Sequence, residues 1–410
     1  MDDENSLSPL PIKAGAPLET HEIVGRERFV NQVWAELAGQ SVVLTAERRM
    51  GKSSIIHLLR ATAQDHGFVA AGGDVEQCSS PAEFVEFIVG SLRSALPGHR
   101  KVLDALNGLI SRVGIEANVG VASFKLQPAA ATDWKVTLFE VLELVDRHKD
   151  EPVVLLLDEL PFMLAKVRDN DSELVARDIL DTLRSIRQTH VGVRMVMSGS
   201  IGLHHVLRGL RTSGTAWAPV NEMLVIEVPP LDHHDAVRLA RRLLRGIPIA
   251  SIPDEPTVAE AMGVAASNIP YYIHHLARGV RDRHGRDGAA ITTGDVDQAL
   301  RAGIADEMDS WNFRYLDERL EDYYGDDAPL ARAALDAMAL SDGTMGFATL
   351  RNVLSASIDE TVTARLTDKN LRTLLTSLKT DHYLRSVDGG VRWRHEVVRR
   401  AWVHLRFLDQ

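Results

Sequence analysis

The sequence predicts an α/β fold in which helices cover both faces of a parallel sheet. Apolar segments alternate with segments of helical periodicity from about residue 27 to residue 230, and this alternation is typical of parallel sheets. One segment, 153–157, consists only of valine and leucine, so we expect it to be a central strand. The expected strands lie near 42–44, 68–71, 153–157, 193–198 and 223–228.

Composition indicates an ordinary globular protein with more than one core. The chain has 410 residues, of which 45% are hydrophobic and 25% are charged, so we expect two or three domains. The net charge of −11 disfavours wholesale binding to nucleic acid or anionic membranes, although a local basic face is compatible with it. The single cysteine, Cys78, excludes an intrachain disulfide and a cysteine-rich zinc site.

The beginning of the chain carries no targeting signal that we recognise. Residues 1–8 are acidic and polar, whereas a signal peptide has a basic region followed by an apolar one. No apolar run approaches the roughly 18 residues that a membrane-spanning helix needs. We therefore expect a cytoplasmic protein.

A phosphate-binding loop is predicted between the strand at 42–44 and the helix that begins at Lys52. Backbone N–H groups of such a loop and the N-terminus of its helix bind anions. Lys52 would reach the β- and γ-phosphates, and the hydroxyl of Ser53 would ligate Mg²⁺. Ala46 stands where the pattern has its first glycine; if that position has positive φ, alanine costs roughly 1–2 kcal/mol. The alternative is an ordinary turn with a surface lysine.

Two carboxylates, Asp158 and Glu159, directly follow the apolar strand at 153–157. The carboxyl end of a parallel strand faces the crevice where ligands bind. There Asp158 would hold Mg²⁺ through water, and Glu159 would orient and deprotonate the attacking water. The alternative is that these two residues cap the next helix. We favour the catalytic interpretation because Lys52 is predicted at the same end of another strand.

A third group of polar residues follows the strand at 193–198. A side chain of Ser198 or Ser200 would lie between Glu159 and the γ-phosphate and could sense it. The Ser-Gly-Ser sequence is also common in turns, so a turn without a sensing role is the alternative.

The order of these motifs resembles the additional-strand P-loop ATPases, which are AAA-like. Within them it is most similar to the archaeal-type ATPases, relatives of the STAND signalling ATPases and of the replication-initiator ATPases. The resemblance covers about residues 22–410 and is carried by the segments 24–27, 47–54, 157–159, 198–200 and 268–271. It implies a P-loop core, a helical lid and a C-terminal winged-helix domain, with ATP and Mg²⁺ as ligands. The implied domains are a leader at 1–21, the core at 22–230, the lid at 231–305 and the winged helix at 306–410.

The resemblance also assigns roles to individual residues. The backbone at Val24 and Gly25 would lie against adenine, and Pro270 would contact the base from the lid. The implied nucleotide contacts of the loop are Glu47, Arg48, Arg49, Met50, Gly51, Lys52, Ser53 and Ser54. The lid motif lacks its usual glycine and has Ser267 and Asn268 instead.

An arginine from a neighbouring subunit often completes such a site, yet no arginine directly precedes the last strand of this sequence. Arg208 and Arg211 are the nearest candidates, with solvated helix charges as the alternative. A nucleotide-dependent homo-oligomer is therefore an expectation from the resemblance.

The C-terminal region is predicted to contain helices followed by a hairpin at Asp388-Gly389-Gly390. Acidic residues and a turn at 317–327 are expected to precede it. Residues 365–410 contain 10 Lys or Arg against 5 Asp or Glu, and a helix with a basic hairpin suits DNA phosphates. The expected DNA contacts are Arg372, Lys379, Arg392 and Arg394. The alternative is a solvated face or one that docks a protein.

We therefore expect a molecular switch that binds ATP and slowly hydrolyses it to ADP and phosphate, with lid and core changing between two arrangements. One alternative is a nucleotide-loaded DNA-binding protein in which hydrolysis is incidental. Another is a protein-partner switch in bacterial stress or defence signalling, which rests on the resemblance alone. A weakly alternating segment at 114–126 could form a hairpin insertion, and we assign it no role.

Overall fold

The computed structural model describes residues 8–96, 103–108, 115–116, 125–126, 134–147, 151–199, 202–210, 217–248, 251–287, 290–341 and 343–408. The chain divides into two compact units. Arg26–Val228 forms the core unit, and Met1–Gly25 together with Pro229–Gln410 forms the lid unit.

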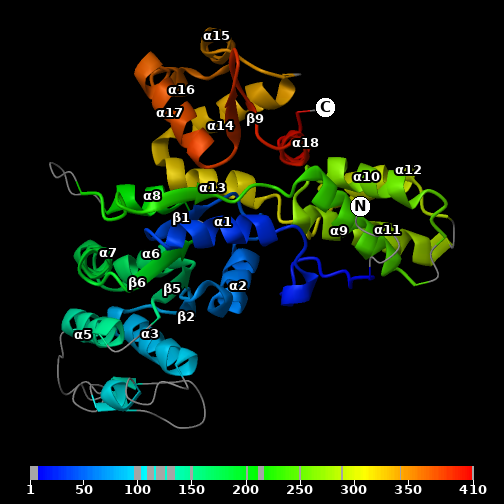
Figure 1. Cartoon of the computed structure of the whole chain (residues 1–410). Coiled ribbons are helices and arrows are strands. Elements are labelled where there is room, and N and C mark those ends of the chain that lie inside the picture. The colour runs from blue at the N-terminus through cyan, green and yellow to red at the C-terminus, as the bar shows by residue number, and fades with distance from the viewer. Residues whose placement is uncertain are drawn as a thin grey trace. The chain divides into compact units, whose positions relative to one another are not determined.

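A parallel sheet of five strands organises the core unit (Figure 1). Its strand order is β2-β5-β6-β1-β7, so the first strand lies inside the sheet, between β6 and β7. Each neighbouring pair is parallel. The strands are β1 (Val42–Thr45), β2 (Val69–Asp74), β5 (Val153–Asp158), β6 (Val193–Ser198) and β7 (Leu224–Glu227). The predicted parallel sheet and all its expected strands are thus confirmed.

Helices cover both faces of this sheet. On one face α1 (Glu27–Leu37) packs on β1, and α2 (Lys52–Thr62) packs on β2 and β5. On the other face α3 packs on β2, while α6 and α7 pack on β6. The other α-helices that build the core unit include α3 (Pro81–Ala95), α5 (Trp134–Arg147), α6 (Leu160–Asn170), α7 (Glu173–Thr189) and α8 (Leu203–Gly209).

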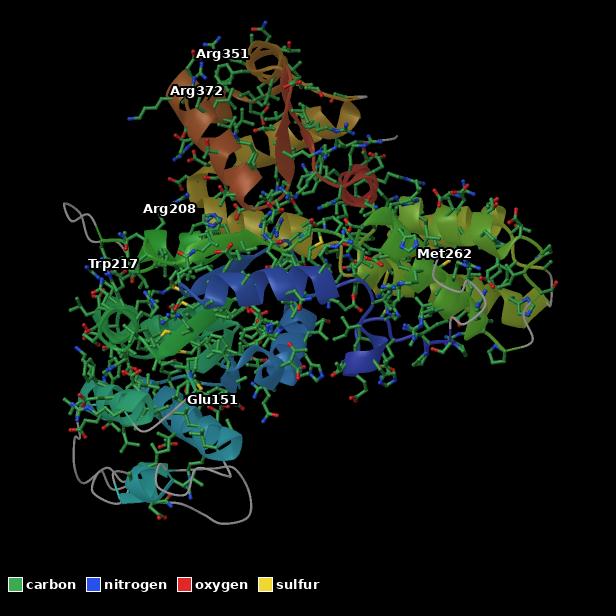
Figure 2. The ribbon with its side chains drawn as sticks, in the orientation of Figure 1. Glu151, Arg208, Trp217, Met262, Arg351 and Arg372 are labelled. Atoms are coloured by element: carbon green, nitrogen blue, oxygen red, sulfur yellow. The ribbon has the colours of Figure 1, made fainter. Side chains whose placement is uncertain are left out.

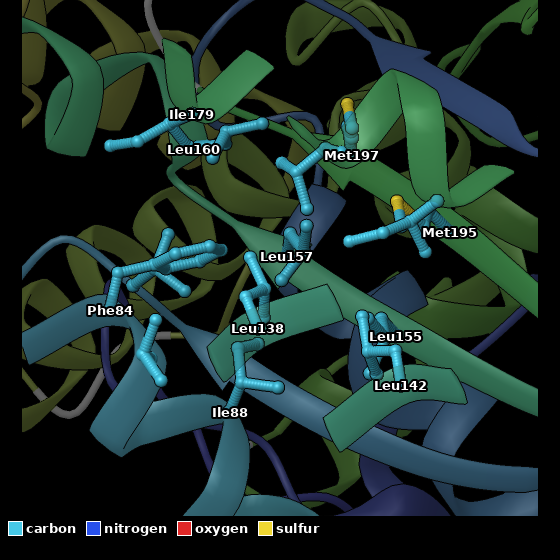
Figure 3. Packing of buried hydrophobic residues seen from close by; sticks show 14 of the residues in the cluster. Phe84, Ile88, Leu138, Leu142, Leu155, Leu157, Leu160, Ile179, Met195 and Met197 are labelled. Carbon is cyan, nitrogen blue, oxygen red and sulfur yellow. The ribbon is translucent and has the colours of Figure 1, made fainter. Parts of the chain in front are cut away.

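The composition of β5 explains its position inside the sheet, between β2 and β6. Its residues Val153–Asp158 are all buried, and alternate side chains enter different layers. Leu155 and Leu157 join the core between the sheet and the second helical layer, together with Phe84 and Ile88 of α3 (Figure 3). Because both faces of the strand need apolar side chains, a run of valine and leucine without alternation is the pattern expected here.

The predicted insertion at 114–126 lies mostly outside the described residues. Within it, β3 (Ile115–Glu116) pairs antiparallel with β4 (Lys125–Leu126), with Ile115 opposite Leu126. The hairpin expectation therefore holds for the residues that are described.

The helical lid consists of four packed helices: α9 (His233–Arg245), α10 (Glu255–Ala265), α11 (Pro270–Asp287) and α12 (Thr293–Ile304). Leu239 and Leu243 lie on the buried face of α9. Asp232 occupies the N-cap position of α9, but its side chain makes no capping hydrogen bond. A capping box is present instead at α12, between Thr292 and Asp295.

The C-terminal region ends in a small β-hairpin. Its strands are β8 (Leu384–Val387) and β9 (Gly390–Trp393), which pair antiparallel as predicted. Met345 adds a bridge to Val391 on the other side of β9. The helices of this region are α13 (Tyr315–Tyr324), α14 (Ala328–Leu340), α15 (Phe347–Ser357), α16 (Glu360–Thr363), α17 (Asp368–Thr380) and α18 (Glu396–Leu405).

The acidic segment 317–327 ends in the predicted turn, which is the short 3-10 helix Gly325–Asp327. Most of it belongs to α13, whose residues Leu316, Arg319 and Leu320 are buried. The Arg319 guanidinium donates to the hydroxyl of Tyr383 and to the carbonyl of Asp381. Tertiary packing therefore makes this acidic segment a helix of the C-terminal region. Among the described residues, no helix is long and apolar enough to cross a membrane.

Candidate nucleotide site

The loop between β1 and α2 has the backbone of an anion-binding turn. Gly51 is the N-cap of α2 and has a φ of 89°, and Arg49 has a φ of 77°. Within this fully described loop, Ala46 is not among the residues of positive φ. The alanine that replaces the expected glycine therefore carries no left-handed strain, and the conditional cost of 1–2 kcal/mol does not apply.

Lys52 is buried at the start of α2, with a relative exposure of only 6%. Its ammonium Nζ donates to the carbonyl oxygens of Ala46 at 2.9 Å and Glu47 at 3.2 Å. Lysine is rarely buried to this degree without partners. The alternative of a turn with a surface lysine is therefore wrong: the cation belongs to the interior of the loop.

Arg26 holds the loop from a second direction. This residue precedes α1, is 3% exposed, and donates from Nη2 to the carbonyl of Met50 at 2.8 Å. The bond ties the loop to the helix that packs on β1. Arg26 lies in the segment 24–27 that carries the family resemblance, but no contact of its side chain was predicted.

Asp158 ends β5 and is buried, with an exposure of 5%. Its Oδ1 accepts a hydrogen bond from the hydroxyl of Ser198, the last residue of β6. The same oxygen accepts from the backbone N–H of Glu159 at 3.1 Å. These donors fix the orientation of the Asp158 carboxylate.

Glu159 has left-handed backbone angles, with φ 56° and ψ 28°. It is the N-cap residue of α6, yet its side chain makes no capping hydrogen bond. The helix-cap alternative is thus wrong for the Glu159 side chain. Non-glycine residues in this conformation are uncommon, and many lie at functional sites.

The end of β6 lies beside the Glu159 carboxylate. A Cβ atom placed on Gly199 would be 3.6 Å from Glu159 Oε2 and 2.5 Å from Cδ of Pro161. Gly199 therefore allows the chain to pass close to the start of α6. Ser200, the second predicted sensing residue, lies outside the described residues.

Sheet topology brings these groups to one edge. In the order β5-β6-β1, Leu157 is in register with Met197, and Ser198 is in register with Leu44. The phosphate loop, the carboxylates and Ser198 therefore all follow the carboxyl ends of neighbouring parallel strands, where ligands bind in open α/β sheets. Such a site offers a cation and helix N–H groups to phosphate, and carboxylates to a hydrated metal ion.

The predicted contacts to adenine, Val24, Gly25 and Pro270, belong to the lid unit. Val24 is buried, and Gly25 has a φ of 72° with its Cα against Asp235: an added Cβ would be 2.5 Å from that residue's Cβ. Pro270 begins α11. Before it, Ser267 and Asn268 adopt φ values of 52° and 59°, so the two residues noted in place of the family's glycine do take the left-handed conformation.

The candidate DNA contacts lie on α17 and the hairpin. Arg372 and Arg392 are exposed, and Lys379 and Arg394 are half-buried. Arg372, labelled in Figure 2, packs over the ring of Phe347 at 4.2 Å. Sequence analysis missed Arg385, which is exposed on β8 directly opposite Arg392. The predicted turn at Asp388-Gly389-Gly390 could have identified it, because a short hairpin turn fixes the register of the two strands.

The remaining residues singled out in the sequence are Arg208, Arg211 and Cys78. Arg208 is an exposed residue of α8 (Figure 2), and Arg211 lies outside the described residues. Cys78 is buried, and burial raises the pKa of its thiol to about 11. Its thiol therefore stays protonated at neutral pH and is a poor nucleophile.

Known proteins resemble this chain in structure but not in sequence. No protein-family model and no curated protein matches this sequence. A Walker-type ATPase of Pyrococcus abyssi is similar in structure, with a TM-score of 0.59 at 16% identity, covering 93% of this chain and 96% of that one. The ORC2 protein of Aeropyrum pernix, solved in ADPNP–ADP complexes, has a TM-score of 0.52 at 10% identity, covering 100% of this chain and 98% of that one.

These likenesses agree with the features that the chain shows by itself. Three features belong to the same architecture. They are the position of β1 between β6 and β7, the loop that leads into α2, and the helical lid. At such low sequence identity, structural similarity establishes the fold only. The chemistry of the site has to be inferred from the residues of this chain. This chain has the fold of an AAA+ P-loop ATPase, with a helical lid and a small C-terminal region that contains a β-hairpin.

Proposed function

We propose that this protein binds ATP with Mg²⁺, hydrolyses it to ADP and phosphate, and uses the nucleotide to switch between two arrangements of core and lid. The observation that carries the proposal is the placement of Lys52, Asp158, Glu159 and Ser198 at the carboxyl ends of three adjacent strands. A cation, a metal-binding carboxylate, a candidate base and a hydroxyl are the groups that phosphoryl transfer to water requires.

Each residue has a chemical role in this proposal. Lys52 and the N-terminus of α2 neutralise the β- and γ-phosphates, and the Ser53 hydroxyl ligates Mg²⁺. The Asp158 carboxylate would help to hold Mg²⁺, and the ion would supply positive charge to the phosphates. Glu159, whose side chain is not used as a helix cap, orients the attacking water and accepts its proton. Ser198 positions Asp158 through their hydrogen bond.

The test of hydrolysis compares two glutamate substitutions. Glu159→Gln should retain ATP binding and lose at least about 100-fold in phosphate release, because general-base catalysis contributes roughly 10²–10⁴-fold. Glu140→Gln is the matched control, since Glu140 is an exposed residue of α5 in the same unit. Wild-type turnover in Glu159→Gln would rule out the proposed base.

The switching part of the proposal rests on a contact within the lid unit. Ser267 in the lid motif accepts a hydrogen bond from the backbone N–H of Val397, at the start of α18, at 3.1 Å. A change at the lid motif would therefore be transmitted to the C-terminal region. Hydrogen exchange at the first turn of α18 should differ between the ATP and ADP states of the wild-type protein. Identical exchange in both states would contradict the coupling.

A second candidate function is DNA binding by the C-terminal region, interpreted as a winged helix. The supporting observation is the cross-strand pair Arg385 and Arg392, both exposed on the hairpin. Two adjacent guanidiniums suit neighbouring phosphates of a duplex. The net charge of −11 opposes binding, so it should be measured at low salt first.

Fluorescence anisotropy with a short duplex tests this candidate. Replacing Arg385 and Arg392 with alanine should reduce the slope of log affinity against log salt by roughly 2, because each lost phosphate contact removes about 0.9. The control removes the same charge from α11, by Arg278→Ala with Arg281→Ala. Absence of binding at low salt in every nucleotide state would leave the hairpin as a solvated or protein-docking face.

A further inference from the structure

A cationic cavity lies in the lid unit, between the last lid helix, α12, and α18 near the end of the chain. Its volume is about 390 Å³, within the usual range of small-molecule pockets. Helices α12 and α18 pack against each other here. The lining residues are Arg301, Ile304, Ala305, Arg399, Arg400, Val403 and His404.

The charged side chains that line this cavity are all basic. Among the described residues that line it, none is acidic, although the whole chain is strongly acidic. Arg399 is paired with Glu396 at 2.7 Å and also donates to the carbonyl of Ala339 at 2.6 Å. In the described part of the chain, the guanidiniums of Arg301 and Arg400 have no ion-pair or hydrogen-bond partner. Two permanent positive charges therefore face the same cavity without a counter-ion from the protein.

We propose that this cavity binds a small molecule bearing a diphosphate or a comparable pair of phosphate groups. A guanidinium binds a phosphate in a bidentate manner, so Arg301 and Arg400 could each hold one phosphate. The apolar side chains of Ile304 and Val403 would contact the remainder of the ligand. A concave pocket of this size suits a small anion better than the backbone of a duplex.

The position of the cavity determines what a bound anion would do. Arg301 belongs to the lid helix α12, and Arg400 belongs to α18. An anion held by both would stabilise the contact between these helices, beside the existing bond from Val397 to Ser267. The ligand would thus restrain the lid motif from outside the candidate nucleotide site.

Residue-resolved chemical protection tests the proposal and separates it from binding at the phosphate loop. Lys52→Ala protein is treated with phenylglyoxal, which modifies arginine, with and without pyrophosphate, and each arginine is followed by peptide mass spectrometry. Pyrophosphate should slow modification of Arg301 and Arg400 several-fold. Arg281, a partly exposed arginine of α11 that pairs with Asp282, should react at an unchanged rate.

Calorimetry in the same Lys52→Ala background provides the affinity. Arg301→Gln with Arg400→Gln should weaken pyrophosphate binding by about 100-fold, or tenfold for each lost charge-assisted contact. Arg281→Gln should leave it unchanged. Equal modification rates with and without pyrophosphate, or unchanged affinity in the double variant, would overturn the proposal. Protection by a short duplex but not by pyrophosphate would also overturn it, because the ligand would then be a nucleic-acid backbone.

Discussion

The hydroxyl of Ser198 donates a hydrogen bond to Oδ1 of Asp158, and this bond joins the ends of neighbouring strands β6 and β5. Both residues are buried, so the carboxylate depends on donors from the protein. The second donor, the N–H of Glu159, binds the same oxygen. Both of these hydrogen bonds go to Oδ1, and no described residue donates to Oδ2 of Asp158, which leaves that oxygen available for the role in Mg²⁺ binding that we propose.

Ser198→Ala should impair hydrolysis more than folding. The substitution removes one donor to the Asp158 carboxylate and should cost about 1 kcal/mol of stability, while phosphate release should fall at least about tenfold because Asp158 loses its fixed orientation. Ser91→Ala is the control, since it deletes a half-buried hydroxyl of α3 that donates to the carbonyl of Ile88. Equal turnover in the two variants would show that Ser198 has no positioning role.

The left-handed backbone of Glu159 predicts a measurable strain. Glu159→Gly and Glu159→Ala both remove the carboxylate, but only glycine adopts a positive φ without steric cost. The glycine variant should therefore be more stable than the alanine variant by about 1 kcal/mol in urea unfolding. Neither variant should hydrolyse ATP. If alanine is as stable as glycine, the left-handed conformation costs nothing at this position.

Gly25 should tolerate no side chain. Its φ of 72° disfavours other residues, and an added Cβ would also meet Asp235 at 2.5 Å. Gly389→Ala is a matched control in the same unit, because Gly389 has a φ of 86° with nothing within 4 Å of its added Cβ. The control isolates a backbone cost of about 1–2 kcal/mol, and Gly25→Ala should lose clearly more. Equal losses of stability would mean that Asp235 moves aside without cost.

Two buried histidines predict that the lid unit loses stability in acid. Burial lowers the pKa of His274 to about 4 and that of His395 to about 3, from an ordinary value of 6.5. Between pH 6.5 and about 4, the unfolded chain therefore binds protons that the folded rings do not. Stability is fully present above pH 6.5 and falls with decreasing pH, by about 1.4 kcal/mol per pH unit for each group.

His274→Gln should flatten this slope by about half, as measured by urea unfolding at a series of pH values. His234→Gln serves as the control, because the side chain of His234 is 85% exposed. A slope that is unchanged in His274→Gln would show that other groups govern the acid sensitivity.

The sequence was most informative where one strand or one helix determines the structure. The run of valine and leucine in β5 identified the central strand, and the polar residues after β1, β5 and β6 identified the edge of the sheet. The burial of Leu371, Leu374, Leu375 and Leu378 on one face of α17 was likewise readable from helical periodicity.

Contacts between distant segments could not be predicted from apolar runs or helical periodicity. The bonds from Lys52 back to its own loop and from Arg26 to Met50 depend on how the chain turns in space. The bond between Ser267 and Val397 joins residues that are 130 positions apart. The helix α13 within the segment 317–327 was not predicted, because the acidic composition conceals residues such as Leu320 that become buried only after packing.

The central claim is that the loop before α2 binds ATP through Lys52, and calorimetric titration with Mg-ATP tests it most directly. The wild-type protein should bind, and Lys52→Ala should bind at least about tenfold more weakly, because a charge-assisted contact to phosphate contributes roughly 1.5–3 kcal/mol. Lys166→Ala, which removes an exposed lysine of the same unit, should bind as the wild type does. Equal affinity in wild type and Lys52→Ala, or no binding by the wild type, would contradict the account.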